Sequence, residues 1–255
     1  MSQSFNVSLD EHVALVTGAA RNLPAVVARQ FAQAGAAVAI VDVAFEDEAN
    51  RLAEEIRQKG GRAEVFLADV SQRDQVEGLT NQVVERLGPI DILINGAGPF
   101  AMAPFKDLPE EDWDRVMDAN LKAIYLLARQ VAPMMIEKGW GRIINVSAGS
   151  ADLRNHSVYG LAKSAVRFLT EALALELGPA ITVNAIAPGQ IAESAPDISE
   201  FDPTFIERAI KWTPTGRLVT RPEITRMMLL FCSPAFDAVT GQTLVMDGGW
   251  GIPRW

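Results

Sequence analysis

Tyr159 and Lys163 lie four positions apart near the start of a long helical pattern. Residues i and i+4 share one helix face, so a phenol and an ammonium group can enter the same pocket. A unit charge ~4 Å away is worth ~4 kcal/mol at an effective dielectric of ~20, which is about three pKa units. We therefore expect Lys163 to lower the pKa of Tyr159 from ~10 toward neutrality. Such a phenol could take a proton from an alcohol or give one to a carbonyl oxygen. The spacing also fits an exposed polar pair without function, and the surrounding elements must decide between the two.

The composition is that of a globular chain with a substantial core. Of its 255 residues, 49% are hydrophobic and 22% are charged. The formal net charge of −9 argues against nucleic acid or an anionic membrane as a partner. One cysteine, Cys232, excludes an intrachain disulfide framework and a zinc-binding thiol cluster, and His12 and His156 form no metal site. No secretory signal pattern is evident, and no run approaches the ~18 apolar residues of a membrane span, so we expect a cytoplasmic protein.

Short apolar runs alternate with helical patterns along the chain. Strands are predicted at His12–Thr17, Ala37–Val41, Ala63–Ala68, Ile90–Ile94, Arg142–Val146, Ile181–Ile186 and Thr243–Met246. Helices are predicted at Ala25–Ala34, Glu46–Lys59, Gln72–Leu87, Glu110–Lys138, Ser157–Leu177 and Arg221–Phe231. Near-continuous apolar strands separated by helices indicate a parallel sheet covered on both faces. With no linker or repeat, we predict one α/β domain over residues 1–255, a Rossmann-like, doubly wound parallel sheet of about seven strands.

Glycine and polar residues follow the predicted strands at the point where each strand ends. They are Gly18, Asp42, Asp69, Asn95, Ser147 and the pair Pro188-Gly189. In doubly wound sheets, ligands bind at the carboxyl ends of the strands, near the position where the strand order reverses. This clustering predicts a binding site at that edge of the sheet.

The first strand leads into a tight turn, residues 17–24, that feeds a helix N-terminus. Such a turn presents free N–H groups and a positive dipole end to a phosphate. Only Gly18 remains of a glycine-rich loop, but Asn22 can adopt the left-handed conformation at a cost of order 1 kcal/mol. Pro24 suits the first position of a helix, where its missing N–H is no loss. The alternative interpretation is an ordinary strand–helix turn.

Two aspartates favour an adenosine ligand. Asp42 follows the second strand, where a carboxylate can bind both ribose hydroxyls and would repel a 2′-phosphate. We therefore predict NAD rather than NADP, although Arg21 could offset the repulsion and Asp42 could be a solvated loop residue. Asp69 can accept a hydrogen bond from the adenine amine, or cap the next helix together with Ser71.

Taken in order, nine motifs resemble those of the classical short-chain dehydrogenase/reductase family. They are TGAARNLP, Asp42, Asp69-Val70, NGAG, Asn120, INVS, Tyr159-x-x-x-Lys163, AIAPG and the terminal Asp247-Gly248-Gly249. The similarity runs from about Leu9 to Trp250, and nine motifs in the right order and spacing are highly specific. The resemblance implies a Rossmann-like fold, an NAD-dependent enzyme that transfers hydride, and usually a homotetramer.

The resemblance also implies a role for each matching residue. Tyr159 would be the general acid/base, and Lys163 would lower its pKa and hold the nicotinamide ribose. Asn120 would keep a water that links Lys163 to solvent, and a serine at the end of the fifth strand would bind the substrate oxygen. With Tyr159 and Lys163, the cofactor would be lined by Gly18, Arg21, Asn22, Leu23, Asp42, Asp69, Val70, Asn95, Ala97, Pro188, Gly189 and Ile191.

The catalytic serine is the first departure from the family pattern. The family commonly places it thirteen residues before the tyrosine, whereas Ser147 lies twelve before Tyr159, and the position expected from the strand end falls on Ala148. We take Ser147 as the candidate, but Ser150 could reach in instead, or the serine role could be vacant.

The other departures concern the cofactor. Asn22 and Pro24 replace two glycines, and Pro24 could displace the diphosphate outward. The family's NNAG is NGAG here, and Glu193, followed by Ser194, stands where a threonine often holds the carboxamide.

A lid-like segment at about 190–217 is expected to cover the substrate. It interleaves apolar residues such as Phe201, Phe205 and Trp212 with acidic ones, and it could equally be a surface helix packed on the domain. With Phe100 and Met102 after the fourth strand, it predicts a mainly apolar pocket for a medium-sized alcohol or ketone.

Two hypotheses on function follow. The first is an NAD-dependent alcohol dehydrogenase or carbonyl reductase that uses Asn120, Ser147, Tyr159 and Lys163 on a medium-sized, mainly apolar secondary alcohol or ketone. The second is a cofactor-independent lyase of the halohydrin-dehalogenase kind, or a non-catalytic protein of the same fold. Pro24 in the phosphate loop motivates the second hypothesis, whereas Lys163, Asp42 and Asn120 favour the first.

Overall fold

A computed structural model describes residues 7–101, 103–149, 156–195 and 204–252. At its centre lies a seven-stranded sheet in the order β3-β2-β1-β4-β5-β6-β7, and all neighbouring strands are parallel. The strands are β1 Val13–Thr17, β2 Ala37–Asp42, β3 Arg62–Leu67, β4 Ile92–Asn95, β5 Gly141–Val146, β6 Ile181–Pro188 and β7 Thr243–Met246. This topology confirms the predicted doubly wound α/β fold.

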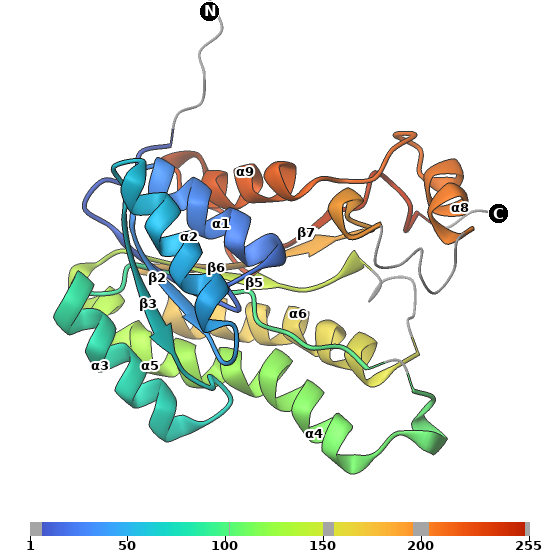
Figure 1. The fold of residues 1–255 in the computed structure, drawn as a ribbon, viewed down its shortest axis with the longest axis horizontal. Coiled ribbons are helices and arrows are strands. Elements are labelled where there is room, and N and C mark those ends of the chain that lie inside the picture. The colour runs from blue at the N-terminus through green and yellow to red at the C-terminus, as the bar shows by residue number, and fades with distance from the viewer. Residues whose placement is uncertain (1–6, 102, 150–155, 196–203, 253–255) are drawn as a thin grey trace, which may run out of the picture.

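Helices cover both faces of the sheet (Figure 1). One layer contains α1 Asn22–Gln33, α2 Glu46–Gln58 and α9 Arg221–Phe231. The other contains α3 Arg73–Leu87, α4 Glu110–Met117, α5 Ala123–Lys138 and α6 Val158–Leu177. The described residues also form α8 Phe205–Trp212 and the single-turn helices η1 Phe105–Asp107, η4 Ala192–Ser194 and η5 Pro234–Phe236.

The strand sequences explain why both faces are covered. All of β1 is buried, and its alternate residues enter two different cores. Ala14 and Val16 pack against the α1, α2 and α9 layer, whereas Val13 and Leu15 pack against the α3, α5 and α6 layer. Side chains of a strand alternate between the faces of the sheet, so a strand buried on both faces must be apolar throughout.

The long helix predicted at Glu110–Lys138 is interrupted. A π-helical turn, η2 Asp118–Lys122, separates α4 from α5, and Asn120 lies in the middle of this turn. The Asn120 amide nitrogen donates to the carbonyl oxygen of Val116 at 2.9 Å. The side chain thus competes with a main-chain N–H for a carbonyl that would otherwise accept an α-helical hydrogen bond. Such π-helical turns are frequent at functional sites.

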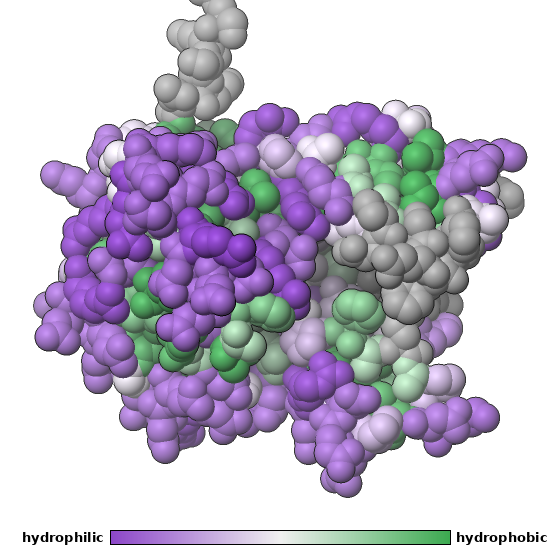
Figure 2. Space-filling view, in the orientation of Figure 1, coloured by the Kyte–Doolittle hydropathy of each residue, from purple (hydrophilic) through white to green (hydrophobic). Residues whose placement is uncertain are grey.

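The predicted lid segment is only partly described. Residues 190–195 and 204–217 belong to the described ranges, whereas Phe201 lies outside them, as do Met102 and Ser150. Figure 2 shows that apolar surface gathers around α8 and near the start of α6, while the surface over α1 and α2 is largely hydrophilic. Within the described ranges, no helix is long and apolar enough to cross a membrane, and no group of three or more His, Cys, Asp or Glu could hold a metal ion.

Candidate active site

The carboxyl ends of β1 to β6 bring the predicted site residues to one edge of the sheet. The strand β1 pairs with both β2 and β4. The strands β2 and β3 are therefore added on one side of β1 and the strands from β4 onward on the other, so the strand order reverses between β1 and β4. Ligands of doubly wound sheets bind in the crevice at this reversal. The loops after β1 and β4 therefore form the centre of the site.

The turn after β1 is held against the loop after β4. Gly18 has φ +66°, and a Cβ at this position would lie 2.9 Å from the Cα of Ala97, so only glycine fits. The Thr17 hydroxyl oxygen accepts hydrogen bonds from the main-chain N–H groups of Gly96 and Ala97, both at 3.1 Å. These contacts fix the entrance to α1 relative to β4.

The first turn of α1 has free main-chain donors. Within the described residues, no hydrogen bond is found for the N–H groups of Arg21, Asn22 and Leu23, and no side chain caps the helix. The first turn also contains no acidic residue. Unpaired N–H groups and the positive dipole end of a 12-residue helix fit a phosphate. The residues present therefore suit the diphosphate of a dinucleotide.

Asn22 adopts the predicted left-handed conformation, with φ +57°. The prediction for Pro24 was wrong in its position, because α1 begins at Asn22 and Pro24 is the third helical residue. The N–H group of the third residue also has no partner within a helix, so proline is tolerated there for the same reason.

Pro24 and Gly96 are accommodated together. A Cβ on Gly96 would lie 2.7 Å from Pro24 Cγ and 2.9 Å from the carbonyl oxygen of Thr17. The absence of a side chain at position 96 therefore leaves space for the proline ring. Two of the departures from the family pattern, Pro24 and the NGAG sequence, are parts of one packing arrangement.

Asp42 is buried at the end of β2 and holds the loops around it. Its Oδ2 accepts from the Ala20 N–H at 3.1 Å, and its Oδ1 accepts from the Val43 N–H at 2.9 Å. A carboxylate has about four acceptor positions, so capacity remains for a ligand hydroxyl. Beside it, the Arg21 guanidinium lies 3.5 Å from the centre of the Phe45 ring, in a cation–π contact.

Asp69 makes a local turn after β3. Its Oδ1 accepts hydrogen bonds from the main-chain N–H and the hydroxyl of Ser71, at 2.9 and 2.6 Å. The alternative that Asp69 and Ser71 cap the next helix is wrong, because Gln72 occupies the N-cap position of α3 and no side-chain hydrogen bond caps it. The following residue, Val70, is buried.

The remaining predicted cofactor positions lie on β4 and after β6. The Asn95 amide donates to Asn145 on β5 at 2.8 Å, and Asn145 donates to Thr170 on α6 at 2.9 Å, which ties these three elements together. Pro188 ends β6, the Gly189 N–H donates to Met246, and Ile191 forms a bridge with Val219.

Asn120, Tyr159 and Lys163 lie together between α4, α6 and the end of β5. The Lys163 ammonium donates to the Val146 carbonyl at 2.7 Å and lies 5.6 Å from the centre of the Tyr159 ring. A Cβ on Gly98 would lie 2.4 Å from Asn120 Oδ1 and 3.2 Å from Lys163 Nζ, so the glycine keeps the space between them open. Asn120 Oδ1 is buried without a hydrogen-bond partner in the described part of the chain.

Burial shifts the pKa values of both titratable groups. The pKa of Tyr159 is raised to about 12 and that of Lys163 is lowered to about 8, because burial penalises the charged form of each. The expectation that Lys163 lowers the pKa of Tyr159 was therefore wrong in direction. The Lys163 ammonium is directed at a main-chain carbonyl, and its own charge is costly in the same buried region.

The Ser147 hydroxyl is engaged within the protein. The residue is 2% exposed, and its hydroxyl donates to the main-chain carbonyl of Lys163 at 2.8 Å. This hydrogen bond attaches the end of β5 to α6 at the lysine. The alternative candidate, Ser150, lies outside the described residues, and Ala148 is buried.

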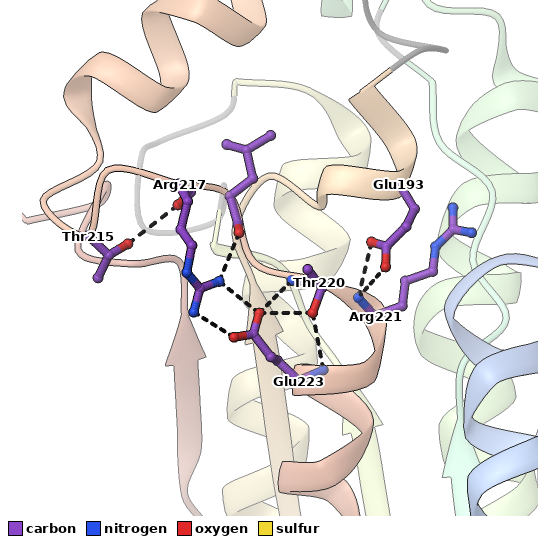
Figure 3. A network of polar contacts seen from close by, with 7 residues as sticks. Glu193, Thr215, Arg217, Thr220, Arg221 and Glu223 are labelled. Atoms are coloured by element: carbon purple, nitrogen blue, oxygen red, sulfur yellow. Dashed lines mark hydrogen bonds and ion pairs between the residues drawn. The ribbon is translucent and has the colours of Figure 1, made fainter.

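A connection that the sequence analysis missed joins α1 to α9. Arg221, the first residue of α9, donates from Nη2 to Asn22 Oδ1 and to Ser194 Oγ, both at 3.1 Å. The carboxylate of Glu193 accepts the Arg221 main-chain N–H (Figure 3). Asn22 and Arg221 are 199 positions apart, so no local spacing could reveal their contact.

The fold and site define an α/β protein of the dinucleotide-binding class. Residues 18–251 match a family described as enoyl-(acyl carrier protein) reductase. Over 252 residues, the chain is 34% identical to the 7alpha-hydroxysteroid dehydrogenase of Escherichia coli K12, covering 98% of each protein. The chain belongs to the short-chain dehydrogenase/reductase family and is an oxidoreductase that uses NAD(P) on hydroxyl or carbonyl substrates.

Two solved structures are similar over nearly their whole length. A 7 alpha-hydroxysteroid dehydrogenase in complex with NADH and 7-oxo glycochenodeoxycholic acid has a TM-score of 0.90 and 34% identity, with 98% of each chain covered. A gluconate 5-dehydrogenase from Burkholderia cenocepacia, in complex with NADP and tartrate, gives the same TM-score of 0.90, 34% identity and 98% coverage of each chain.

The first prediction concerns the packing of Pro24 against Gly96. Gly96→Ala should lower the free energy of unfolding by about 2 kcal/mol, as expected for overpacking. Pro24→Ala in the same chain should recover part of this loss, with a coupling energy of about 1 kcal/mol in a double-mutant cycle measured by urea denaturation. Gly78→Ala, a helical position with nothing within 4 Å of the added Cβ, is the control. Additive effects of the two substitutions would refute the coupling.

The second prediction concerns the buried charge of Lys163. Its pKa is lowered to about 8 in the folded protein, so between pH 8 and its unfolded value of ~10.4 the unfolded chain binds more protons and stability rises with pH. Lys163→Met lacks this contribution. The stability of the parent protein relative to this variant should therefore rise by about 2 kcal/mol between pH 8 and pH 10. If the difference in stability between the parent protein and Lys163→Met stays constant from pH 8 to pH 10, the pKa of Lys163 is not lowered by folding.

Proposed function

We propose that the protein is an NAD(H)-dependent carbonyl reductase and alcohol dehydrogenase for a medium-sized, mainly apolar secondary alcohol or ketone. The observation that carries the proposal is the cluster of Tyr159, Lys163 and Asn120 beside the unpaired N–H groups of α1. These unpaired N–H groups also favour the hydride-transfer enzyme over the cofactor-independent lyase. They remain available to a phosphate although Pro24 lies in the first turn of α1.

Tyr159 acts as the proton donor in carbonyl reduction. With a pKa of about 12, its phenol is protonated at neutral pH, which is the form that a carbonyl oxygen needs. Lys163, with a pKa of about 8, can return a proton to Tyr159 in this pH range. A bound nicotinamide supplies the hydride in this direction and accepts it in alcohol oxidation.

Asn120 and Ser147 have different roles in this proposal. The unpartnered Oδ1 of Asn120 faces the space beside Lys163 Nζ, where it can bind a water that connects the lysine to solvent. Ser147 positions Lys163 through the main-chain carbonyl and does not donate to the substrate. We therefore assign proton transfer to Tyr159 and Lys163 without a serine hydroxyl in the same step.

The substrate preference is argued from aromatic residues around the site. Phe100, which is 67% exposed, meets the Tyr159 ring edge-on with 6.3 Å between ring centres. In the lid-like segment, Phe205 contacts Trp250 in the same manner at 6.2 Å. Aromatic rings on two sides suit a substrate with an extended apolar body. The hydroxysteroid substrate of one relative has such a body.

The preference for NAD is argued from Asp42. Its buried carboxylate retains acceptor capacity for ribose hydroxyls and would repel a 2′-phosphate. Arg21 lies over the Phe45 ring, which holds its guanidinium against an aromatic face. One similar structure contains NADH and another contains NADP, so the choice between the two cofactors is argued from Asp42 and not from the relatives.

We also propose that the protein is a homotetramer. Exposed apolar side chains lie along α5 and α6, where Tyr125 is 43% exposed, Phe168 75% and Leu175 87%. Large apolar groups of this kind, clustered on neighbouring helices, mark protein–protein interfaces. A second copy of the chain, presenting the same surface, would cover them by two-fold symmetry.

The third prediction tests the role of Tyr159. Tyr159→Phe removes only the hydroxyl group and should lower the turnover number for ketone reduction by about 10²- to 10⁴-fold, because the proton donor is lost. The affinity for NADH, measured by calorimetry, should change less than about twofold. Activity close to that of the parent protein would exclude Tyr159 as the general acid.

The fourth prediction tests the NAD preference. Asp42→Asn should raise the Kd for NADH at least about tenfold, equivalent to ~1.4 kcal/mol, while the Kd for NADPH falls or stays unchanged. The matched control is Glu46→Gln, which removes an exposed carboxylate from the start of α2 nearby. Titration by NADH fluorescence measures both values. A parent protein that binds NADPH more tightly than NADH would contradict the proposal.

A further inference from the structure

Arg221 bridges the two sides of the candidate cofactor site. Its Nη2 donates to Asn22 at the start of α1 and to Ser194 in η4, the segment that follows β6. Figure 3 shows its guanidinium extending away from Glu223, on the side of the blue N-terminal part of the chain. The side chain therefore crosses from α9 to the unpaired N–H groups of α1.

The guanidinium of Arg221 has no counter-charge. Among the described residues, no ion pair is found for it, and the Glu193 carboxylate binds only its main-chain N–H. Its Nε is buried and has no hydrogen-bond partner in the same part of the chain. Arg217, only four positions earlier, makes two hydrogen bonds to Glu223 at 2.9 and 2.6 Å. Of these two arginines, Arg217 has a carboxylate partner, whereas no ion pair is found for Arg221 among the described residues.

The position of Arg221 is unfavourable for a cation. It is the first residue of α9, and its guanidinium contacts Asn22, the first residue of α1. Glu193 and Glu223 place carboxylates at the N-terminus of α9, but the first turn of α1 has no acidic residue, so a cation beside its partial positive charge is unfavourable. The unpaired buried N–H of Arg221 adds to this cost. Both costs disappear if an anion binds between Arg221 and α1.

We propose that Arg221 binds the diphosphate of the dinucleotide together with the main-chain N–H groups of Asn22 and Leu23. The proposal rests on the proposed function, and it assigns a cofactor contact to a residue of α9, the helix that packs beside α1. A guanidinium matches phosphate oxygens with parallel N–H donors and keeps its charge at all relevant pH values. It supplies binding energy where the loop between β1 and α1 has lost two glycines.

The test measures binding instead of turnover. Arg221→Gln should raise the Kd for NADH and for ADP-ribose at least about tenfold, because both contain the diphosphate, and leave the Kd for adenosine within about twofold. Arg221→Lys should give an intermediate loss, since it keeps the charge without the planar fork. Arg226→Gln removes an exposed positive charge from the same helix and should leave all three values unchanged. Fluorescence titration with NADH, and displacement of NADH by the other two ligands, give the values.

Two results would overturn the assignment. A Kd for NADH within twofold of the parent value in Arg221→Gln would show that Arg221 does not contact the cofactor. Equal losses for adenosine and ADP-ribose would show that the substitution only loosens Asn22 and Ser194. If the parent protein itself binds neither NADH nor ADP-ribose, the proposed function fails and this assignment fails with it, a result distinct from the first two.

Discussion

The buried ammonium of Lys163 is the interaction around which the site is built. Two contacts from the end of β5 hold this residue, because the Val146 carbonyl accepts from its Nζ and the Ser147 hydroxyl donates to its main-chain carbonyl. Gly98 leaves the space above it, and a π-helical turn places Asn120 beside it. Burial makes this charge costly and lowers the pKa of Lys163 to about 8.

The turn between β1 and α1 keeps its shape although asparagine and proline stand at two positions where the family usually has glycine. Asn22 reaches the left-handed conformation that glycine adopts more easily, and Gly96 provides the space that the Pro24 ring requires. The free N–H groups of the first turn of α1 therefore remain in place. Arg221 brings a positive charge to this turn from α9, which packs beside α1. The loss of glycine at two positions is offset by residues that lie far away in sequence.

Apolar periodicity predicted the doubly wound parallel sheet, and helical spacing predicted that Tyr159 and Lys163 share one helix face, whereas Asn120 was added to this pair only by the family resemblance. Prediction from the sequence failed where the outcome depends on the surroundings. The pKa of Tyr159 rises because burial outweighs the neighbouring charge, and the Ser147 hydroxyl turns toward α6. The contact between Asn22 and Arg221 is set by how α9 packs against α1, which no local pattern contains.

A crystal structure of the protein with NADH and a ketone inhibitor tests the central claim most directly. The account predicts that the diphosphate lies on the N–H groups at the start of α1. It also predicts that the Tyr159 hydroxyl donates to the inhibitor's carbonyl oxygen above the nicotinamide ring, within about 3 Å. A Tyr159 hydroxyl that points away from the nicotinamide, or a cleft filled by the protein's own side chains, would contradict it.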